Sequence, residues 1–386
     1  MAKVILGIDQ INENKHLFDG NIALLSHSAS VTSDLRHSAI VFKEVFGERL
    51  TKLFGPQHGF VTDVQDNMVE TQDFHHPYFN IPVHSLYGET RQPTKEMLKG
   101  IDTFVIDLQD VGTRVYTYIH TMSLAMEACR EEGIKVIVLD RPNPIGGTKI
   151  EGPLLDPKFK SFVGLHPIPQ RHALTIGEMA LLINEQFISP CNLEVLSMKN
   201  WDRKMSWKDT GLTWINPSPN LSTPESCYSF VGTVLFEGTN ISEGRGTTRA
   251  LEFVGHPDIE PFRFAEHLNK NYTSEGIYFR PQVFLPTFQK FKGEVCGGVQ
   301  LHVTDQDSGS PWLAGQYLCR ELMNILGEKF QWSTAPYEYE FEGMPIDFIN
   351  GTDQLRFWCE GNSSLSEIEE LINDSVFGFA QNNKLY

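Results

Sequence analysis

Positive charge is scarce in this sequence, where 32 Lys and Arg residues stand against 49 Asp and Glu and the formal net charge is −17. A protein that binds nucleic acid neutralises phosphates with a basic patch, and no run of Lys and Arg occurs here. We therefore expect no nucleic-acid partner. An acidic surface of this kind mainly confers solubility.

Long apolar runs are also missing, because no stretch reaches the roughly 18 residues of a membrane-spanning helix. Membrane insertion is therefore not expected. The opening Met1-Ala2-Lys3 continues directly into Val4 and Ile5, without the charged and apolar regions of a signal peptide. This pattern predicts a cytoplasmic protein, with a periplasmic or secreted protein whose signal peptide has been removed as the alternative.

The six cysteines are widely spaced and contain no C-x-x-C pair. Neither a zinc site nor a compact disulfide framework is therefore expected, and we interpret the cysteines as free core thiols. The histidines and aspartates between residues 58 and 84 have no fixed metal-ligand spacing either, so no metal is predicted.

The chain does have enough residues for more than one core, since single cores stop growing near roughly 250–300 residues and this chain has 386. In the first half, short apolar runs alternate with amphipathic segments, a pattern typical of parallel strands joined by crossover helices. The predicted strands are residues 4–8, 22–26, 52–54, 103–108 and 135–139, and the predicted helices are residues 38–50, 118–132 and 176–187, the last with a capping box at its start.

A turn-rich stretch at residues 216–220 precedes a different pattern, with strands expected at residues 229–236 and 299–303 and helices at 312–327 and 365–373. We predict an α/β protein with a parallel-sheet domain over residues 1–226 and a second, smaller α/β or α+β domain over residues 227–386.

Polar residues cluster where the predicted strands of the first domain end, and ligands of open parallel sheets bind beyond the carboxyl ends of the strands. The candidates for binding are His58 in one such loop, then Asp107, Gln109, Asp110, Arg114 and Tyr116 in the next, and Arg141 and Asn143 in a third. The alternatives that need no function are a turn with a solvated His and a buried Asp–Arg pair.

Two other stretches are rich in chemistry. Glu89 lies between a Gly and a Thr, close to Tyr87 and Arg91; the ring favours the neutral acid form of a carboxyl and the cation opposes it. A surface Glu in a turn is the alternative. Residues 236–249 contain three glycines, which let the backbone approach a ligand. They also supply the side chains of Glu237, Asn240, Glu243, Arg245 and Arg249.

Several common catalytic signatures are absent. No Walker motif occurs, no Gly-x-Gly-x-x-Gly follows the first strand, and no Gly-x-Ser-x-Gly elbow is present. We therefore expect no nucleotide cofactor and no Ser–His–Asp hydrolase.

Taken together, the clusters resemble the NamZ-type exo-β-N-acetylmuramidases, a family of glycoside hydrolases, over nearly the whole chain. The matching motifs are Tyr87-Gly88-Glu89-Thr90, Asp107-Leu108-Gln109-Asp110-Val111-Gly112, Asp140-Arg141-Pro142-Asn143-Pro144, Pro217-Ser218-Pro219-Asn220 and Phe236-Glu237-Gly238-Thr239-Asn240. The resemblance implies a Rossmann-like first domain without a dinucleotide, a smaller second domain, and a cleft between them that includes Asn220. Gln57, Ala173 and Ala250 depart from the pattern of the family, which usually has Glu at the first position.

The resemblance also implies that Glu89 is catalytic and that terminal N-acetylmuramic acid is released from a β-1,4 linkage to N-acetylglucosamine in peptidoglycan fragments. Such a reaction needs an acid and a second group. Glu89 is assigned as the acid, with Asp107, Asp110, Glu237 or Glu243, or the acetamido group of the substrate, in the second role.

The lactyl carboxylate of the sugar would be bound by one or more of Arg114, Arg141, Arg245 and Arg249. No cofactor is implied. A peptidoglycan-fragment binding protein without catalysis and a metal-dependent hydrolase are the two alternatives, and the sequence does not specify an oligomeric state.

Overall fold

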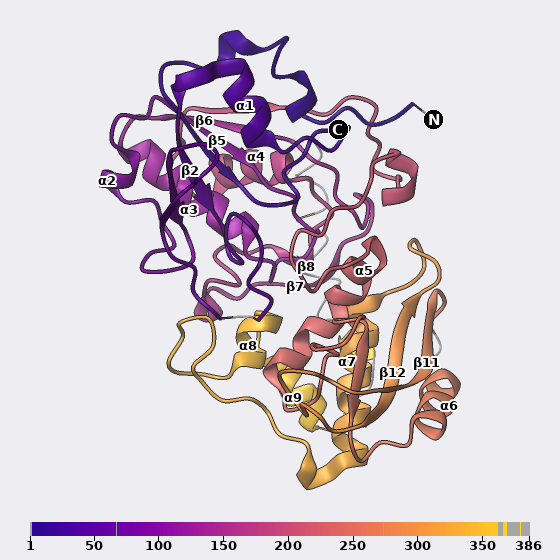
Figure 1. Ribbon diagram of the computed structural model, residues 1–386. Helices are drawn as coiled ribbons and strands as arrows, with labels where there is room; N and C mark the ends of the chain where they lie inside the picture. Colours follow the sequence, from indigo (N-terminus) through magenta and orange to yellow (C-terminus); the bar gives the residue numbers. More distant parts are fainter. Residues whose placement is uncertain (1, 67, 273, 362–365, 369–378, 380–386) are drawn as a thin grey trace.

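The computed structural model describes residues 2–66, 68–272, 274–361, 366–368 and 379. Figure 1 shows two parts, with the larger, indigo to magenta part above and the smaller, orange to yellow part below. Among the described residues, no helix has both the length and the apolar character needed to cross a membrane. The six cysteines are unpaired and five of them are buried, as predicted.

The larger part is built on a seven-stranded sheet. Its strand order is β3 (Phe74–His75), β4 (Pro82–Ser85), β2 (Leu50–Gly55), β1 (Ile22–Ser26), β5 (Thr103–Asp107), β6 (Lys135–Leu139) and β9 (Leu193–Leu196). Neighbouring strands are parallel except for β3, which pairs antiparallel with β4. The parallel sheet predicted from the apolar runs is therefore confirmed.

Alternate residues of the strands enter two separate hydrophobic cores, as the twofold repeat of a strand requires. Leu24 and Val105 pack in the core that contains α1 (Ser38–Phe46), whereas Leu25 and Ile106 pack in the core that contains α3 (Tyr118–Glu131) and α4 (Ile176–Gln186). Helices thus cover both faces of the sheet. This is the doubly wound arrangement that places ligands at the carboxyl ends of the strands.

The predicted helices of this part are present with nearly the expected bounds. Helix α4 begins with a complete capping box, in which Thr175 accepts from the backbone N–H of Glu178 while the Glu178 carboxylate accepts from the N–H of Thr175. A short helix, α2 (Lys95–Leu98), precedes β5. A two-stranded antiparallel sheet of β7 (Glu151–Leu154) and β8 (Pro169–Arg171) completes the larger part.

The smaller part has an antiparallel sheet in the order β10 (Phe253–His256), β12 (Cys296–Val303) and β11 (Ile277–Phe284). Its helices are α5 (Pro224–Thr233), α6 (Pro261–Asn271), α7 (Pro311–Leu326), α8 (Pro345–Asn350) and α9 (Gln354–Glu360). This part, a sheet with helices, is the second, smaller α/β or α+β domain that the sequence predicts. The predicted domain boundary at residue 226 falls inside α5.

Two element predictions are wrong. Residues 229–236 form no strand; they belong to α5 and to the 3₁₀ helix η6 (Val234–Gly238). Helix α5 begins at Pro224 because Thr223 caps its N-terminus and Pro224 occupies its first turn. Within the described part of the chain, residues 4–8 form no strand and make a single bridge, between Ile5 and Lys199. Most of the helix expected at residues 365–373 lies outside the described residues.

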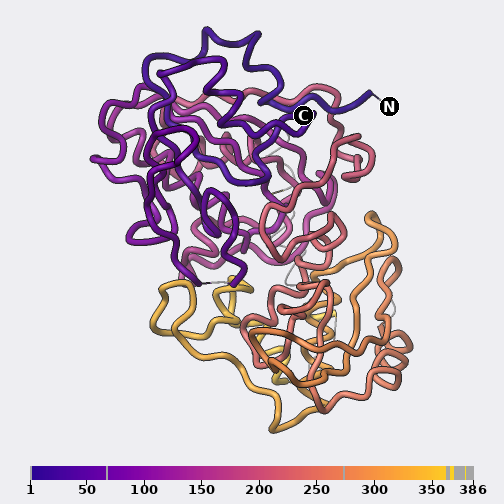
Figure 2. The backbone as a smooth tube through the Cα atoms, viewed as in Figure 1, coloured from indigo at the N-terminus to yellow at the C-terminus, as the bar shows by residue number. Residues whose placement is uncertain are grey.

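The loop after β2 reaches from the larger part to the smaller one. The Tyr339 hydroxyl donates to a Glu70 carboxylate oxygen over 2.7 Å, and the Gln289 amide donates to Asp66. In Figure 2 this indigo stretch meets the orange-yellow part of the chain. The contacts hold the two parts together beside the carboxyl end of the sheet.

Candidate active site

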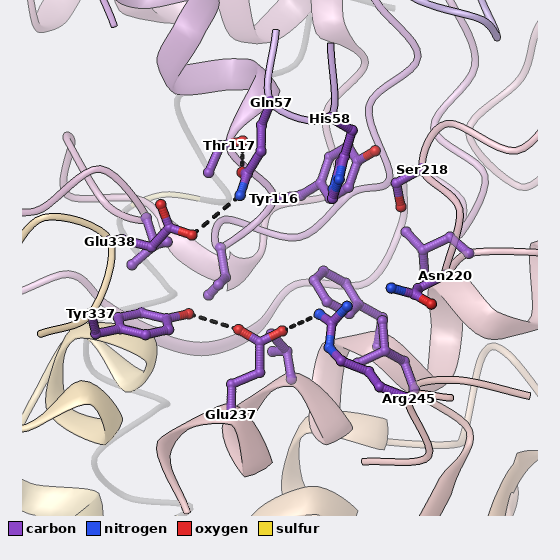
Figure 3. Close-up of a pocket in the computed structure, with 16 residues that line it drawn as sticks. Gln57, His58, Tyr116, Thr117, Ser218, Asn220, Glu237, Arg245, Tyr337 and Glu338 are labelled. Atoms are coloured by element: carbon purple, nitrogen blue, oxygen red, sulfur yellow. Dashed lines mark hydrogen bonds and ion pairs between the residues drawn. The ribbon is translucent and has the colours of Figure 1, made fainter. Parts of the chain in front are cut away.

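A cavity lies where the carboxyl end of the large sheet meets the smaller part. Both parts contribute to it, because Gln57 follows β2 and Thr117 precedes α3, whereas Glu237 lies in η6. Figure 3 labels the polar lining, which comprises Gln57, His58, Tyr116, Thr117, Ser218, Asn220, Glu237, Arg245, Tyr337 and Glu338.

Glu338 is a buried carboxyl, only 4% exposed, in the lining of this cavity. Its two oxygens accept hydrogen bonds from different loops of the larger part, one from the Gln57 amide over 3.2 Å and one from the Tyr87 hydroxyl over 2.8 Å. The Gln57 amide oxygen in turn accepts from Thr117 over 2.6 Å. The carboxyl is therefore fixed in orientation.

Burial raises the pKa of Glu338 to about 7. The hydrogen bond from Tyr87 opposes this shift, the charge of Glu237 adds to it, and Gln57 and Arg91 oppose it more weakly. Desolvation outweighs the donors because burial penalises the ionised form of a carboxyl. Glu338 is thus close to its midpoint of titration at neutral pH.

Glu237 has the opposite surroundings. It pairs with the Arg245 guanidinium, and the Tyr337 hydroxyl donates to its other oxygen over 2.9 Å (Figure 3). Arg245 also lies 3.1 Å from Glu243, which a Lys290 ammonium contacts over 2.8 Å. Burial lowers the pKa of Arg245, but the two carboxylates outweigh it and raise that pKa overall.

The cavity therefore holds two carboxyl groups with different neighbours, Glu338 between two neutral donors and Glu237 beside a guanidinium. Titratable pairs whose environments push them apart provide the acid and the base of many enzymes. Such an arrangement suits proton transfer to a leaving group while a negative charge faces the reacting carbon.

Models of two family domains match the chain. The N-terminal domain of the exo-β-N-acetylmuramidase NamZ matches residues 22–225, and the C-terminal domain of NamZ matches residues 228–386. This chain belongs to the NamZ exo-β-N-acetylmuramidase family. The resemblance inferred from the motifs is confirmed.

A peptidoglycan β-N-acetylmuramidase NamZ of Bacillus subtilis is 42% identical over 387 residues, which cover 100% of this chain and 91% of the relative. Two DUF1343 proteins of Bacteroides fragilis, known from crystal structures, share the fold. The first is 34% identical with a TM-score of 0.89, covering 100% of both chains. The second is 29% identical with a TM-score of 0.76, covering 100% of this chain and 99% of that one.

Five of the predicted site residues of this NamZ family member line the cavity, namely His58, Tyr116, Asn220, Glu237 and Arg245. Burial lowers the pKa of His58 to about 4, so its imidazole is neutral near pH 7. The Nδ1 atom of this ring lies 2.8 Å from the Val64 carbonyl oxygen. Two more predicted residues support the lining from behind, since Tyr87 contacts Glu338 and Glu243 contacts Arg245.

A second group of predicted residues is buried outside the cavity lining and held by other contacts, although Asp110 Oδ1 and the Nε and Nη1 atoms of Arg114 have no hydrogen-bond partner among the described residues. Asp107 and Arg141 form an ion pair of 2.6 Å, which is the structural alternative considered for an Asp and an Arg here. Gln109 donates to the Pro142 carbonyl oxygen, and Asn143 donates to that of Leu174. Arg114 donates to the Gln170 side-chain oxygen and to the Ile349 carbonyl oxygen. Asp110 accepts from the backbone N–H of Gly112.

The last group lies outside the cavity lining. Glu89 is exposed and lines a separate surface depression with Glu70 and Asp73. Arg249 is exposed and pairs with Glu252 over 3.3 Å. Asn240 donates to the Lys329 carbonyl and accepts from the N–H of Gln331, which ties two loops together. The catalytic and binding roles assigned to these residues from the sequence stay predictions.

Sequence reasoning missed the two residues that complete the cavity, Tyr337 and Glu338. The only local signal was an alternation of tyrosines and glutamates after Pro336, which is equally typical of a solvated segment. Gln57 was noted only as a departure from the family pattern. Among the described residues, no group of three or more His, Cys, Asp or Glu side chains is arranged to bind a metal ion.

Proposed function

We propose that this protein is an exo-acting glycoside hydrolase that releases terminal N-acetylmuramic acid from β-1,4-linked peptidoglycan fragments, in the turnover or recycling of cell wall. The main structural support is that two buried carboxyl groups with different neighbours, Glu237 and Glu338, line one cavity. Cleavage of a glycosidic bond uses two such groups. The full-length similarity to a peptidoglycan β-N-acetylmuramidase supports the substrate.

The shape of the site supports action on chain ends. The cavity lies where the two parts of the chain meet, and both parts contribute polar side chains to its lining. The loop after β2 bridges to the smaller part through Glu70 and Tyr339, beside Glu338. A loop that bridges the two parts on one side of the cavity suits the end of a glycan chain better than its middle.

Arg245 supports recognition of a sugar that carries a carboxylate. It is the only Arg or Lys in the described lining of the cavity, and its guanidinium is the fork-shaped donor that matches a carboxylate. Its two present partners, Glu237 and Glu243, leave the cation within reach of the cavity. The lactyl group of N-acetylmuramic acid is the part of the substrate with this chemistry.

The test is release of sugar from a β-1,4 N-acetylmuramyl-N-acetylglucosamine disaccharide by the purified protein. Glu237→Gln is the inactive control, since it keeps the shape but removes the charge that faces Arg245. We expect release of N-acetylmuramic acid by wild type and a loss of at least about 10²-fold in the variant. If wild type releases no sugar from this disaccharide or from a longer muramyl-terminated fragment, the proposal is wrong.

The two alternative functions give different results in the same assay. A binding protein without catalysis would bind the disaccharide and leave it intact, and Glu237→Gln would still bind. A metal-dependent hydrolase would lose its activity in EDTA and regain it with a divalent cation. We expect EDTA to leave the rate unchanged.

A further inference from the structure

We infer that Glu338 is the proton donor of the reaction, the group that protonates the glycosidic oxygen as its bond to N-acetylmuramic acid breaks. This assignment rests on the proposed function and names one residue that performs its chemistry. It gives the acid role to a side chain of the smaller part, whereas the sequence motifs place it on Glu89 in the larger part.

The geometry holds Glu338 as a donor should be held. Gln57 and Tyr87 each occupy one lone pair of a different carboxyl oxygen, and each oxygen has a second position left for a proton. Because Thr117 fixes the Gln57 amide oxygen, the amide nitrogen faces Glu338. Glu338 and Gln57 both line the cavity, so the remaining acceptor positions of the fixed carboxyl lie beside it.

The charges around Glu338 set when it carries the proton. Glu237 from η6 and the hydroxyl of Tyr337 face it from the smaller part, and Tyr87 and Arg91 face it from the larger part. The pKa of about 7 keeps about half of the molecules protonated at neutral pH. A general acid is most effective when its pKa lies near the working pH.

Arg245 and Tyr337 contact different oxygens of Glu237, and both act as hydrogen-bond donors to it. The negative charge of Glu237 stabilises the positive charge that develops at the anomeric carbon. Glu338 is thus the proton donor and Glu237 the stabilising negative charge, and the side chains that contact each carboxyl determine these roles.

The step balances as follows. The O–H bond of Glu338 breaks and an O–H bond forms on the glycosidic oxygen, which keeps the electron pair of its bond to the anomeric carbon and leaves as the hydroxyl of the second sugar. Water then adds its oxygen to the anomeric carbon and returns one proton to the carboxyl pair. No oxidant or other reactant is needed.

A comparison of leaving groups tests the assignment. A sugar hydroxyl leaves only when it is protonated, whereas a nitrophenolate leaves without a proton. Glu338→Gln is therefore expected to lose about 10²- to 10⁴-fold in rate on the disaccharide and less than about tenfold on a 4-nitrophenyl β-N-acetylmuramide. Glu237→Gln, the matched control, is expected to lose activity on both substrates.

The pH profile gives a second, independent readout. Removing the Tyr87 hydroxyl takes away a hydrogen bond that lowers the pKa of Glu338, so Tyr87→Phe is expected to shift the basic limb of kcat/KM to higher pH. The Tyr87→Phe variant keeps the aromatic ring, Glu237 and Glu338. It therefore tests the assignment even if Glu338→Gln does not fold. Thermal unfolding of each variant shows whether it is folded.

The outcomes are separable from those of the proposed function. If wild type cleaves the disaccharide but Glu338→Gln, folded as wild type, loses equally on both substrates or on neither, Glu338 is not the donor. An unchanged basic limb in Tyr87→Phe overturns the assignment as well. A wild type inactive on every muramide contradicts the proposed function itself.

Discussion

The Gln57 amide nitrogen donates a hydrogen bond of 3.2 Å to the Glu338 carboxyl, joining residues that are 281 positions apart in the chain. The amide is neutral and bound to Thr117 on its other side. The hydrogen bond from Gln57 thus lowers the pKa of Glu338, against the larger upward effect of burial. The charge of Glu237, in contrast, raises the pKa of Glu338.

Substituting Gln57→Glu is expected to move the basic limb of kcat/KM to higher pH by at least about one unit. Two carboxyls at this separation cannot both ionise easily, so they share a proton and one pKa rises strongly. The measurement is the rate of sugar release from the disaccharide between pH 5 and 9. Gln57→Met, which removes the hydrogen bond without adding charge, is expected to shift the limb in the same direction by less. A shift to lower pH in the Glu variant would contradict the interpretation.

Glu338 is also expected to make folding stability depend on pH. Its pKa is near 4.5 when solvated and about 7 when folded, so its contribution is fully present below about pH 4.5 and is lost as pH rises through 7. At about 1.4 kcal/mol per pH unit, the loss over this window is about 3 kcal/mol. Urea unfolding of wild type and Glu338→Gln at pH 4.5 and pH 8 measures it as a difference. Equal pH dependence of the two proteins would show that the folded carboxyl has an ordinary pKa.

Much of the large sheet could be predicted because its strands are buried on both faces and read as short apolar runs, such as residues 103–108. The strand predicted at residues 229–236 failed because Phe230, Val231 and Val234 pack as core residues of α5 and η6. Thr223 and Pro224 were the local signals for a helix start. In this stretch capping outweighed the β-propensity of the branched and aromatic residues.

The site was predictable only where its residues sit at strand ends or in glycine-rich turns, as His58 and Arg245 do. Glu338 has no such signal, because its burial comes from Gln57 and Tyr87, which lie 281 and 251 positions away. Asp107 and Arg141 show the opposite case. Both lie at or just after strand ends, but they form a buried ion pair with each other and do not line the cavity. For these three residues, contacts between distant parts of the chain decide whether the side chain lines the cavity.

Glu89→Gln tests the role that the sequence motif suggests for this residue. The Glu89 side chain is exposed and lines a depression other than the cavity of Glu237 and Glu338. We therefore expect the variant to release sugar from the disaccharide within about tenfold of wild type. The matched comparison is Glu338→Gln at the same pH and substrate concentration. A loss of about 10²-fold or more in Glu89→Gln alone would assign catalysis to Glu89 and place the reacting bond on the other side of Tyr87.

Arg245 is expected to decide between sugars with and without a lactyl carboxylate. In the free protein it pairs with Glu237 and Glu243; a substrate carboxylate would add a third partner to the same fork. Arg245→Gln removes the cation, so the ratio of kcat/KM for an aryl N-acetylmuramide to that for an aryl N-acetylglucosaminide is expected to fall by about tenfold or more, as the loss of one charged hydrogen bond predicts. Arg249→Gln is the matched control, because Arg249 is exposed, pairs with Glu252 and lies outside the cavity lining. Equal loss on both sugars in Arg245→Gln would limit Arg245 to holding Glu237, and the lactyl group would then need a different donor, such as the Asn220 amide in the same lining.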